Sequence, residues 1–420
     1  GVKYADEHDF AAVWLPERHF NSYGGFSPNP SIVAAALARE TKRIHLRAGS
    51  VVLPLHHPIR VAEEWAMIDN LSGGRVGISF ASGWHPNDFV FAPDAYEARR
   101  QVMDDGIEMV RKLWRGETVP VRNGRGEQIS VGLSPMPSQP ELPFWLTGGT
   151  HGTGAKAGRL GAGFLTNLQD QTIDELAEKI EVYHKSLSEH GHDRAQARVT
   201  VLMHTYVVED LGKALADSTQ PFRDYLHAAM GLRSTRNRNE GPRIDLSKVS
   251  AADLEFFLSA GFERYKRVGT LIGTPDSCAE IVDKLIRIGV TEVGCLIDFG
   301  IPTGDVMASL EHLNTLRMRY LPAASATADP TPIHVSADTP APADAGYVVP
   351  LTDTQKQFWV LTQLGEQISR QYNESVTLTL RGPLNVAALS AALQAMVARH
   401  DALRSTFSPE GDYQQVHPTM

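Results

Sequence analysis

The chain has 420 residues, 42% of them hydrophobic and 21% charged, a composition typical of a globular protein with one large domain and a smaller one. The formal net charge of -9 argues against nucleic acid as a partner, and no apolar run reaches the about 20 residues that span a membrane. The two cysteines, Cys278 and Cys295, lack metal-ligand spacing, so we expect no metal site and a cytoplasmic location.

Apolar runs predict seven strands that alternate with amphipathic helices along the first three quarters of the chain. The strands are expected at residues 11–15, 44–53, 76–81, 143–147, 163–167, 199–208 and 293–299. The helices are expected at residues 32–40, 60–71, 95–113, 155–160, 172–190, 275–288 and 305–320. Alternation of this kind predicts a parallel sheet with crossover helices.

Residues 1–9 have the pattern of the end of a helix, so we expect a further strand upstream of Gly1. The predicted fold is therefore an α/β (β/α)8 TIM barrel that lacks its first strand here, with an open sheet of six or seven strands as the alternative.

Two insertions interrupt the alternation of strands and helices. Residues 118–131 alternate around Asn123-Gly124 and predict a hairpin. Residues 209–270 are interpreted as either a lid over the barrel mouth or a solvated surface loop.

The composition changes after Leu321. Residues 322–350 contain six prolines and neither Lys nor Arg, which predicts a linker that cannot bury enough apolar surface to fold. We therefore expect a barrel domain at 1–321, a linker at 322–350 and the start of an α+β domain at 351–420. In this last part we expect a helix from Thr352, a strand at 375–380 and a helix at 386–400.

Several long motifs carry a resemblance to a known family. The barrel part is similar to the luciferase-like flavin monooxygenases, of the type embedded in nonribosomal peptide synthetases. The motifs are VWLPERHF, AGSVVLPLHHPIRVAEEWAMIDNLSGGR, ISFASGWHPNDF, WLTGGT and IGTPDSCAEIVDKL. At the C-terminal end, TDTQKQFWVLTQL and RHDALRSTF resemble the opening motifs of a condensation domain. The catalytic histidine motif of that family is not included, so we expect no condensation activity from this fragment.

The resemblance implies a barrel that binds reduced FMN, uses oxygen as co-substrate and oxygenates a substrate tethered by phosphopantetheine to a carrier protein. It also implies a separate flavin reductase, and a homodimer is one expected assembly. Two alternatives stay open. One is a deazaflavin-dependent enzyme that transfers hydride, and the other is a catalytically silent barrel that serves as an interaction module.

His19 and Arg18 are the predicted catalytic residues, because they follow a strand at the end where barrel sites form. The imidazole of His19 can exchange protons near neutral pH, although a histidine held by local hydrogen bonds is the simpler interpretation. Arg18 stands where luciferases carry their catalytic histidine. Since Arg stays protonated, either His19 takes over the proton transfer or Arg18 anchors a charged group.

The resemblance also implies the cofactor-binding residues. Gly49 and Ser50 occupy the place where the family often has a non-proline cis peptide beneath the flavin ring, unless they only pack the interior. In the next loop, Ser82 and Gly83 are candidates, and Ser82 stands where a luciferase arginine holds the FMN phosphate. The phosphate is then expected at a Gly-rich loop that leads into a short helix. The candidates in this loop are Gly148, Gly149, Thr150 and Thr153, with a simple turn as the alternative.

Other residues of these motifs are interpreted as structural. His57 precedes a proline at a helix start, and the pair His56-His57 lacks a third ligand for a metal. Trp84, Trp145 and Phe80 either form a wall for the flavin ring or belong to the core.

Overall fold

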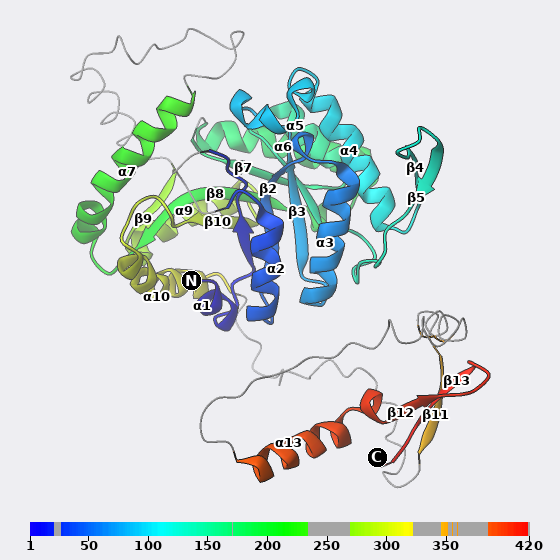
Figure 1. The fold of residues 1–420 in the computed structure, drawn as a ribbon. Helices are drawn as coiled ribbons and strands as arrows, with labels where there is room; N and C mark the ends of the chain where they lie inside the picture. The colour runs from blue at the N-terminus through cyan, green and yellow to red at the C-terminus, as the bar shows by residue number, and fades with distance from the viewer. Residues whose placement is uncertain are drawn as a thin grey trace. The chain divides into compact units, whose positions relative to one another are not determined.

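The computed structural model describes residues 1–20, 27–169, 171–233, 269–321, 346–351, 355, 359 and 385–418. The chain divides into two compact units, Gly1–Pro322 and Ala323–Met420. The first unit contains a curled parallel sheet with its helices on the outside (Figure 1).

All seven predicted strands are present and pair in parallel in the order in which they occur in the chain. They are β1 (Ala12–Leu15), β2 (His45–Val52), β3 (Val76–Ala81), β6 (Phe144–Thr147), β7 (Gly163–Asn167), β8 (Val199–Val207) and β10 (Glu292–Leu296). An additional strand that we did not predict, β9 (Thr270–Gly273), pairs with the second half of β8. This strand has only four residues, follows Gly269 and ends at Gly273, so it is too short for its alternation to be recognised.

The helices of this unit also follow the predicted order. They are α1 (Val2–Glu7), α2 (Pro30–Glu40), α3 (Pro58–Ser72), α4 (Arg99–Trp114), α5 (His151–Arg159), α6 (Ile173–Glu189), α7 (Leu211–Arg233), α9 (Pro275–Arg287) and α10 (Thr303–Met318). Local signals explain their ends. The His57 side chain accepts a hydrogen bond from the Ile59 N–H at the start of α3, which confirms its structural role, and α6 begins with a capping box of Thr172 and Glu175.

The insertion at residues 209–270 differs from the prediction in its first part. Residues Leu211–Arg233 form α7, because this stretch is rich in Ala and Leu and the mixed-charge sequence begins only after it. The predicted lid or loop at residues 234–268 lies outside the described residues. The predicted hairpin is present as β4 (Val119–Arg122) and β5 (Gln128–Val131), but five residues connect its strands. The Asn123 side chain accepts hydrogen bonds from the N–H groups of Arg125 and Glu127, which favours the longer turn.

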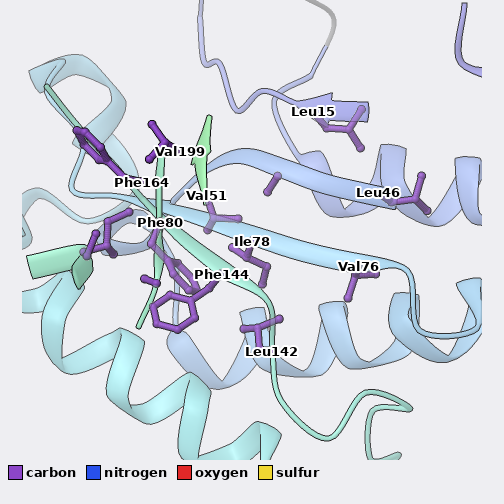
Figure 2. Packing of buried hydrophobic residues seen from close by; sticks show 14 of the residues in the cluster. Leu15, Leu46, Val51, Val76, Ile78, Phe80, Leu142, Phe144, Phe164 and Val199 are labelled. Atoms are coloured by element: carbon purple, nitrogen blue, oxygen red, sulfur yellow. The ribbon is translucent and has the colours of Figure 1, made fainter. Parts of the chain in front are cut away.

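The hydrophobic core lies between the sheet and the surrounding helices. Figure 2 shows Val76, Ile78 and Phe80 of β3 with Phe144 of β6, packed toward the helices. Because side chains alternate along a strand, the intervening Gly77 and Trp145 belong to the inner face of the curled sheet. Trp145 is 1% exposed there, so it is a core residue, as is Phe80, and neither lines the cavity described below.

The inner face also carries a half-buried carboxylate that joins strands β1, β2 and β10 of the parallel sheet. Glu292 of β10 accepts hydrogen bonds from Trp14 Nε1 of β1 at 2.8 Å and from Arg47 Nη1 of β2 at 2.7 Å. The Arg47 guanidinium lies 4.6 Å from the centre of the Trp145 ring. These contacts fix the curvature of the sheet where β1 and β10 face each other.

The second unit contains β11 (Tyr347–Pro350), α13 (Val386–Arg399), β12 (Ser405–Phe407) and β13 (Tyr413–Val416). The linker prediction is wrong for its last residues, because β11 pairs with β13 in an antiparallel sheet. The run Tyr-Val-Val favours a strand, and the Pro and Ala content that indicated a linker ends before it. The helix predicted from Thr352 and the strand predicted at 375–380 lie outside the described residues.

Asp6 of α1 is a buried carboxylate that stabilises the fold through hydrogen bonds to the backbone. Its carboxylate accepts hydrogen bonds from the N–H groups of Lys42, Arg43 and Ile44, at 2.9, 2.7 and 2.8 Å. Burial raises the pKa of Asp6, but these hydrogen bonds outweigh burial, and the net shift is downward. The stabilisation is therefore present above the usual pKa of 3.8 and is lost as the pH falls through the lower value of the folded state.

We expect Asp6→Asn to lower the free energy of unfolding near neutral pH, and the difference from the parent to shrink as the pH falls. Urea unfolding at a series of pH values from about 7 to about 3 measures this difference. Asp94→Asn, at an exposed carboxylate, is the control and should show little difference at any pH. A difference for Asp6→Asn that does not change with pH would contradict the prediction.

Candidate active site

A cavity of about 1540 Å³ opens at the carboxyl ends of the strands. Residues that follow β1, β3, β6 and β7 line it, together with the last residues of β2, and this is where barrel enzymes place their active sites. It also extends between β1 and β10, where Val2, Leu285 and Leu313 line it. Nine of the ten predicted site residues lie in its wall: Arg18, Gly49, Ser50, Ser82, Gly83, Gly148, Gly149, Thr150 and Thr153.

His19 is the tenth, and among the described residues it does not line the cavity. Its side chain is 7% exposed and its ring lies 5.0 Å from the ring of Phe91. Nε2 of His19 is 2.8 Å from Oε1 of Glu17. The structure thus has Glu17 and Arg18 in the cavity wall and His19 behind them.

Glu17 is a fully buried carboxylate held by two imidazoles and one amide. The same Oε1 atom that contacts His19 lies 2.6 Å from Nε2 of His56, and Oε2 accepts a hydrogen bond from the Val52 N–H at 2.7 Å. Burial raises the pKa of Glu17, but the hydrogen bonds from His19 and His56 outweigh burial and lower the pKa overall. Glu17 is therefore ionised at neutral pH. Sequence reasoning missed the role of Glu17, because its partner His56 is 39 positions away in the chain.

Arg18 shares the cavity wall with His204, near the carboxyl end of β8. His204 is 2% exposed and is enclosed by the rings of Phe222, Tyr225 and Phe299, whose centres lie 4.9, 4.5 and 5.5 Å from its own. Burial, together with the positive charge of Arg18, lowers the pKa of His204 to about 3. His204 is thus a neutral imidazole in the cavity wall. Sequence reasoning missed His204. A usable signal was that His204 lies two residues after Leu202 and therefore points to the same face of the strand.

Ser50 belongs to a row of hydroxyl groups that runs from the cavity wall to the buried Ser79 of β3. Its Oγ lies 2.5 Å from Oγ1 of Thr147, which in turn lies 2.6 Å from Oγ of Ser79. The peptide bond between Gly49 and Ser50 is cis, as the resemblance predicts. A Cβ atom on Gly49 would lie 3.1 Å from the ring of Trp14, so a larger residue there would displace that ring.

The loop after β3 approaches the loop after β2 closely at Gly83. Gly83 has a φ of +75°, and a Cβ atom there would lie 2.8 Å from Val52 and 2.9 Å from Phe89. Only glycine fits this conformation and this contact. Ser82 and Trp84 on either side both line the cavity, so Trp84 is the one aromatic residue of the three considered that reaches it.

The loop after β6 leads directly into α5. The Thr150 side chain caps this helix by accepting a hydrogen bond from the Thr153 N–H, and its Oγ1 lies 3.0 Å from Oγ1 of Thr153. Amides at a helix start point toward an approaching anion and have no acceptor within the helix. The sequence prediction relied on these amides and hydroxyls alone, because Ser82 stands where luciferases have a cation.

The cations Arg99, Arg100 and Lys156, which we did not predict, also line the cavity. Arg99 and Arg100 begin α4, and Lys156 lies on α5, where it contacts Asp104. The pair of arginines at the start of an amphipathic helix is visible in the sequence. The sequence does not show that α4 packs near α5, which brings these arginines to the cavity. The cavity therefore contains positive charge for an anionic ligand.

Within the described parts of the chain, no group of three His, Cys, Asp or Glu residues is arranged to hold a metal ion. None of the helices described is long and apolar enough to cross a membrane.

The sequence comparisons agree with this geometry. Residues 2–292 match the family model of the luciferase-like monooxygenases, and residues 346–419 match that of the condensation domain. The oxygenase component of the flavin-dependent trigonelline monooxygenase of Acinetobacter baylyi is 29% identical over 74% of this chain and 85% of its own length.

Solved structures share the fold. The monooxygenase RslO1 from Streptomyces bottropensis matches with a TM-score of 0.61 and 24% identity, over 75% of this chain and 90% of its own. The oxygenating constituent of 3,6-diketocamphane monooxygenase from Pseudomonas putida, solved in complex with FMN, matches with a TM-score of 0.58 and 20% identity, over 74% of this chain and 89% of its own.

A curled parallel sheet with its cavity at the carboxyl ends of the strands defines a fold of the TIM-barrel class, and the match to monooxygenases makes it an oxidoreductase. The chain belongs to the luciferase-like monooxygenase family and continues into a condensation domain fragment. The silent-barrel alternative is thereby set aside, since the curated relatives are named as monooxygenases.

Proposed function

We propose that residues 1–321 are an FMN-dependent monooxygenase domain of a peptide synthetase, or of a hybrid peptide and polyketide synthetase. In this proposal a linker connects the domain to a condensation domain, and a separate flavin reductase supplies reduced FMN. The substrate is an intermediate tethered to a carrier protein by phosphopantetheine. The single observation that carries the proposal is a cavity that combines a capped helix start, three cations and a glycine-lined floor at the carboxyl ends of the strands.

The residues of the cavity fit a flavin mononucleotide. Thr150, Thr153 and the first amides of α5 would bind the phosphate, with Arg100 and Lys156 supplying positive charge. Gly49 and Gly83 would present their backbone to the flavin ring, because both line the cavity, and Trp84 gives an aromatic surface. The flavin, once reduced and bound, supplies the reactivity with oxygen.

The chain's own residues position the substrate and control its protons. Arg18 keeps its charge at all relevant pH values and would anchor an anionic or strongly polar group of the substrate. His204, as a neutral imidazole, can donate one hydrogen bond and accept another, and the aromatic rings around it exclude water. Glu17 holds a negative charge behind Arg18.

The proposed activity is tested with the full chain, a separate flavin reductase, NADH, FMN and a set of aminoacyl-loaded carrier proteins. We expect an oxygen-dependent mass gain of one oxygen atom on at least one carrier-bound acyl group. The alternative of hydride transfer predicts that a reduced deazaflavin is consumed without oxygen and that no mass of oxygen is gained. The curated relatives, which are named as monooxygenases, favour the first outcome.

The phosphate site is tested by binding, without turnover. We expect Thr153→Val to weaken FMN binding about 10-fold, because one hydroxyl donor to a charged group is lost. Riboflavin, which lacks the phosphate, should bind the variant and the parent equally. Fluorescence titration measures both affinities, and Thr118→Val, in the loop before the hairpin, is the control. A loss of riboflavin affinity equal to the loss of FMN affinity would contradict a phosphate contact by Thr153.

A further inference from the structure

We propose that Glu17 joins His19 and His56 into one unit that takes up a single titrating proton, and that this unit sets the charge of the cavity wall beside Arg18. Glu17 is thus a positioning residue. Its effect on oxygenation rests on the proposed function, whereas the coupling of the two histidines does not.

The geometry makes one oxygen atom the acceptor for both rings. Nε2 of His19 and Nε2 of His56 lie 2.8 and 2.6 Å from the same Oε1 of Glu17. Because an ionised carboxylate can only accept, both Nε2 atoms carry a proton. The atom at which each ring takes up its second proton is therefore Nδ1. The Val52 N–H occupies Oε2, so the carboxylate cannot turn to serve the two rings separately.

The charges explain why the unit holds only one such proton. One protonated ring neutralises the single negative charge of Glu17, and a second would leave two like charges meeting at one buried oxygen atom. Like charges at about 4–6 Å disfavour each other's charged form. Protonation of His56 therefore opposes protonation of His19, although 37 residues separate them in the sequence.

The two rings differ in their access to solvent. The His56 side chain is 31% exposed, whereas that of His19 is 7% exposed and that of Glu17 is fully buried. Burial lowers the pKa of His56, but the hydrogen bond and charge of Glu17 outweigh it, and the net shift is upward. We therefore assign the titrating proton to His56, which is the more exposed of the two rings and exchanges it with solvent.

Other charged groups face this unit. Glu64 of α3 contributes to the upward shift of the pKa of His56. On the other side, Asp88 senses the charges of His85 and His19, and its carboxylate lies 3.5 Å from His85. Arg18 adds a fixed positive charge at the next position in the chain. None of these groups contacts Oε1 of Glu17 in the hydrogen bonds described for this site. The protonation of the unit therefore depends mainly on its two histidines.

The unit would act as a charge switch in the cavity wall. At a pH below the pKa of His56, the unit is neutral and the charge of Arg18 is available to an anionic substrate group. At a higher pH, His56 releases its proton and Glu17 places an uncompensated negative charge behind Arg18. Binding of an anionic group should then weaken as the pH rises through this value.

Histidine ring NMR on the full chain, without flavin, tests the coupling. Ring signals are followed from about pH 5 to about pH 9 and assigned with single-histidine variants. We expect both rings to carry their neutral-state proton on Nε2. His56→Gln keeps a donor for Glu17 but removes the competing charge, so the midpoint of His19 protonation should rise by about one pH unit. Glu17→Gln should lower both midpoints by about one pH unit.

The control is His57→Asn, which keeps a side-chain cap for α3 and should move neither midpoint. Unchanged His19 titration in His56→Gln would overturn the proposal. If Glu17→Gln does not fold, His56→Gln decides alone, because it retains the buried carboxylate. Coupled titration in a protein without oxygenase activity would refute only the proposed function, and oxygenation with independent titrations would refute only the coupling.

Discussion

Gly163→Ala should lower the free energy of unfolding of the barrel unit by about 3 kcal/mol, the upper range for overpacking a core. A Cβ atom on Gly163 of β7 would lie 2.1 Å from Cδ1 of Trp145 on the neighbouring strand β6. The indole cannot retreat, because a Cβ at Gly77 on its other side would already lie 2.9 Å from it. Arg47 and Arg198 further hold the ring, at 4.6 and 4.5 Å from its centre.

Urea unfolding followed by tryptophan fluorescence measures this loss, with Gly132→Ala as the matched control. Gly132 lies in an open loop, where the nearest atom to an added Cβ is 3.6 Å away. We expect the control to change the free energy of unfolding by less than about 0.5 kcal/mol. Equal stabilities of the two variants would mean that Trp145 moves freely within the sheet, and would contradict the packing described here.

Arg18→Gln should lower kcat/KM for the carrier-bound substrate about 100-fold. A charge-assisted hydrogen bond lost in a water-excluded site costs about 2–3 kcal/mol, which corresponds to this factor. If Arg18 anchors the substrate in both ground and transition states, the loss should appear mainly as a higher KM. The measurement is steady-state oxygen incorporation, read by mass spectrometry of the carrier-bound product.

Two further variants separate charge from packing. Arg18→Lys keeps the charge and should recover part of the lost kcat/KM, since an ammonium group lacks the planar donors of arginine. Arg60→Gln, at a side chain that is 69% exposed on α3, should leave kcat/KM unchanged. A loss of no more than twofold in Arg18→Gln would exclude Arg18 as an anchor of the substrate.

The order of elements was predictable because each carries its own local signal. The strands β3 and β7 agree with the prediction to the residue, since an apolar run bounded by turn residues has few alternatives. The caps at Thr172 and Thr274 are equally local. The errors fall where the signal is short or where composition misleads: β9 has four residues, α7 lies in a stretch interpreted as a loop, and β11 follows a Pro-rich segment.

The location of the site was predictable from the sequence, but the part that each residue plays in it was not. The residues that follow the strands line the cavity as expected, because carboxyl ends of parallel strands share one edge. The placement of Arg18 in the cavity wall and of His19 behind it was not predictable. Adjacent residues point to opposite sides of the chain, and the sequence does not say which side faces the cavity. His204 and the cations of α4 and α5 come from elements that sequence separates widely.

The sequence by itself determined the strand and helix order, the edge at which the site forms and the family to which the motifs belong. These properties follow from periodicity, capping and turn chemistry, which act over a few residues. Only the tertiary structure decided that Glu17 serves two histidines, that Arg18 lies near His204 and that Arg99, Arg100 and Lys156 line the same cavity as the α5 start. These contacts join residues far apart in the chain, and their geometry depends on how the helices pack against the sheet.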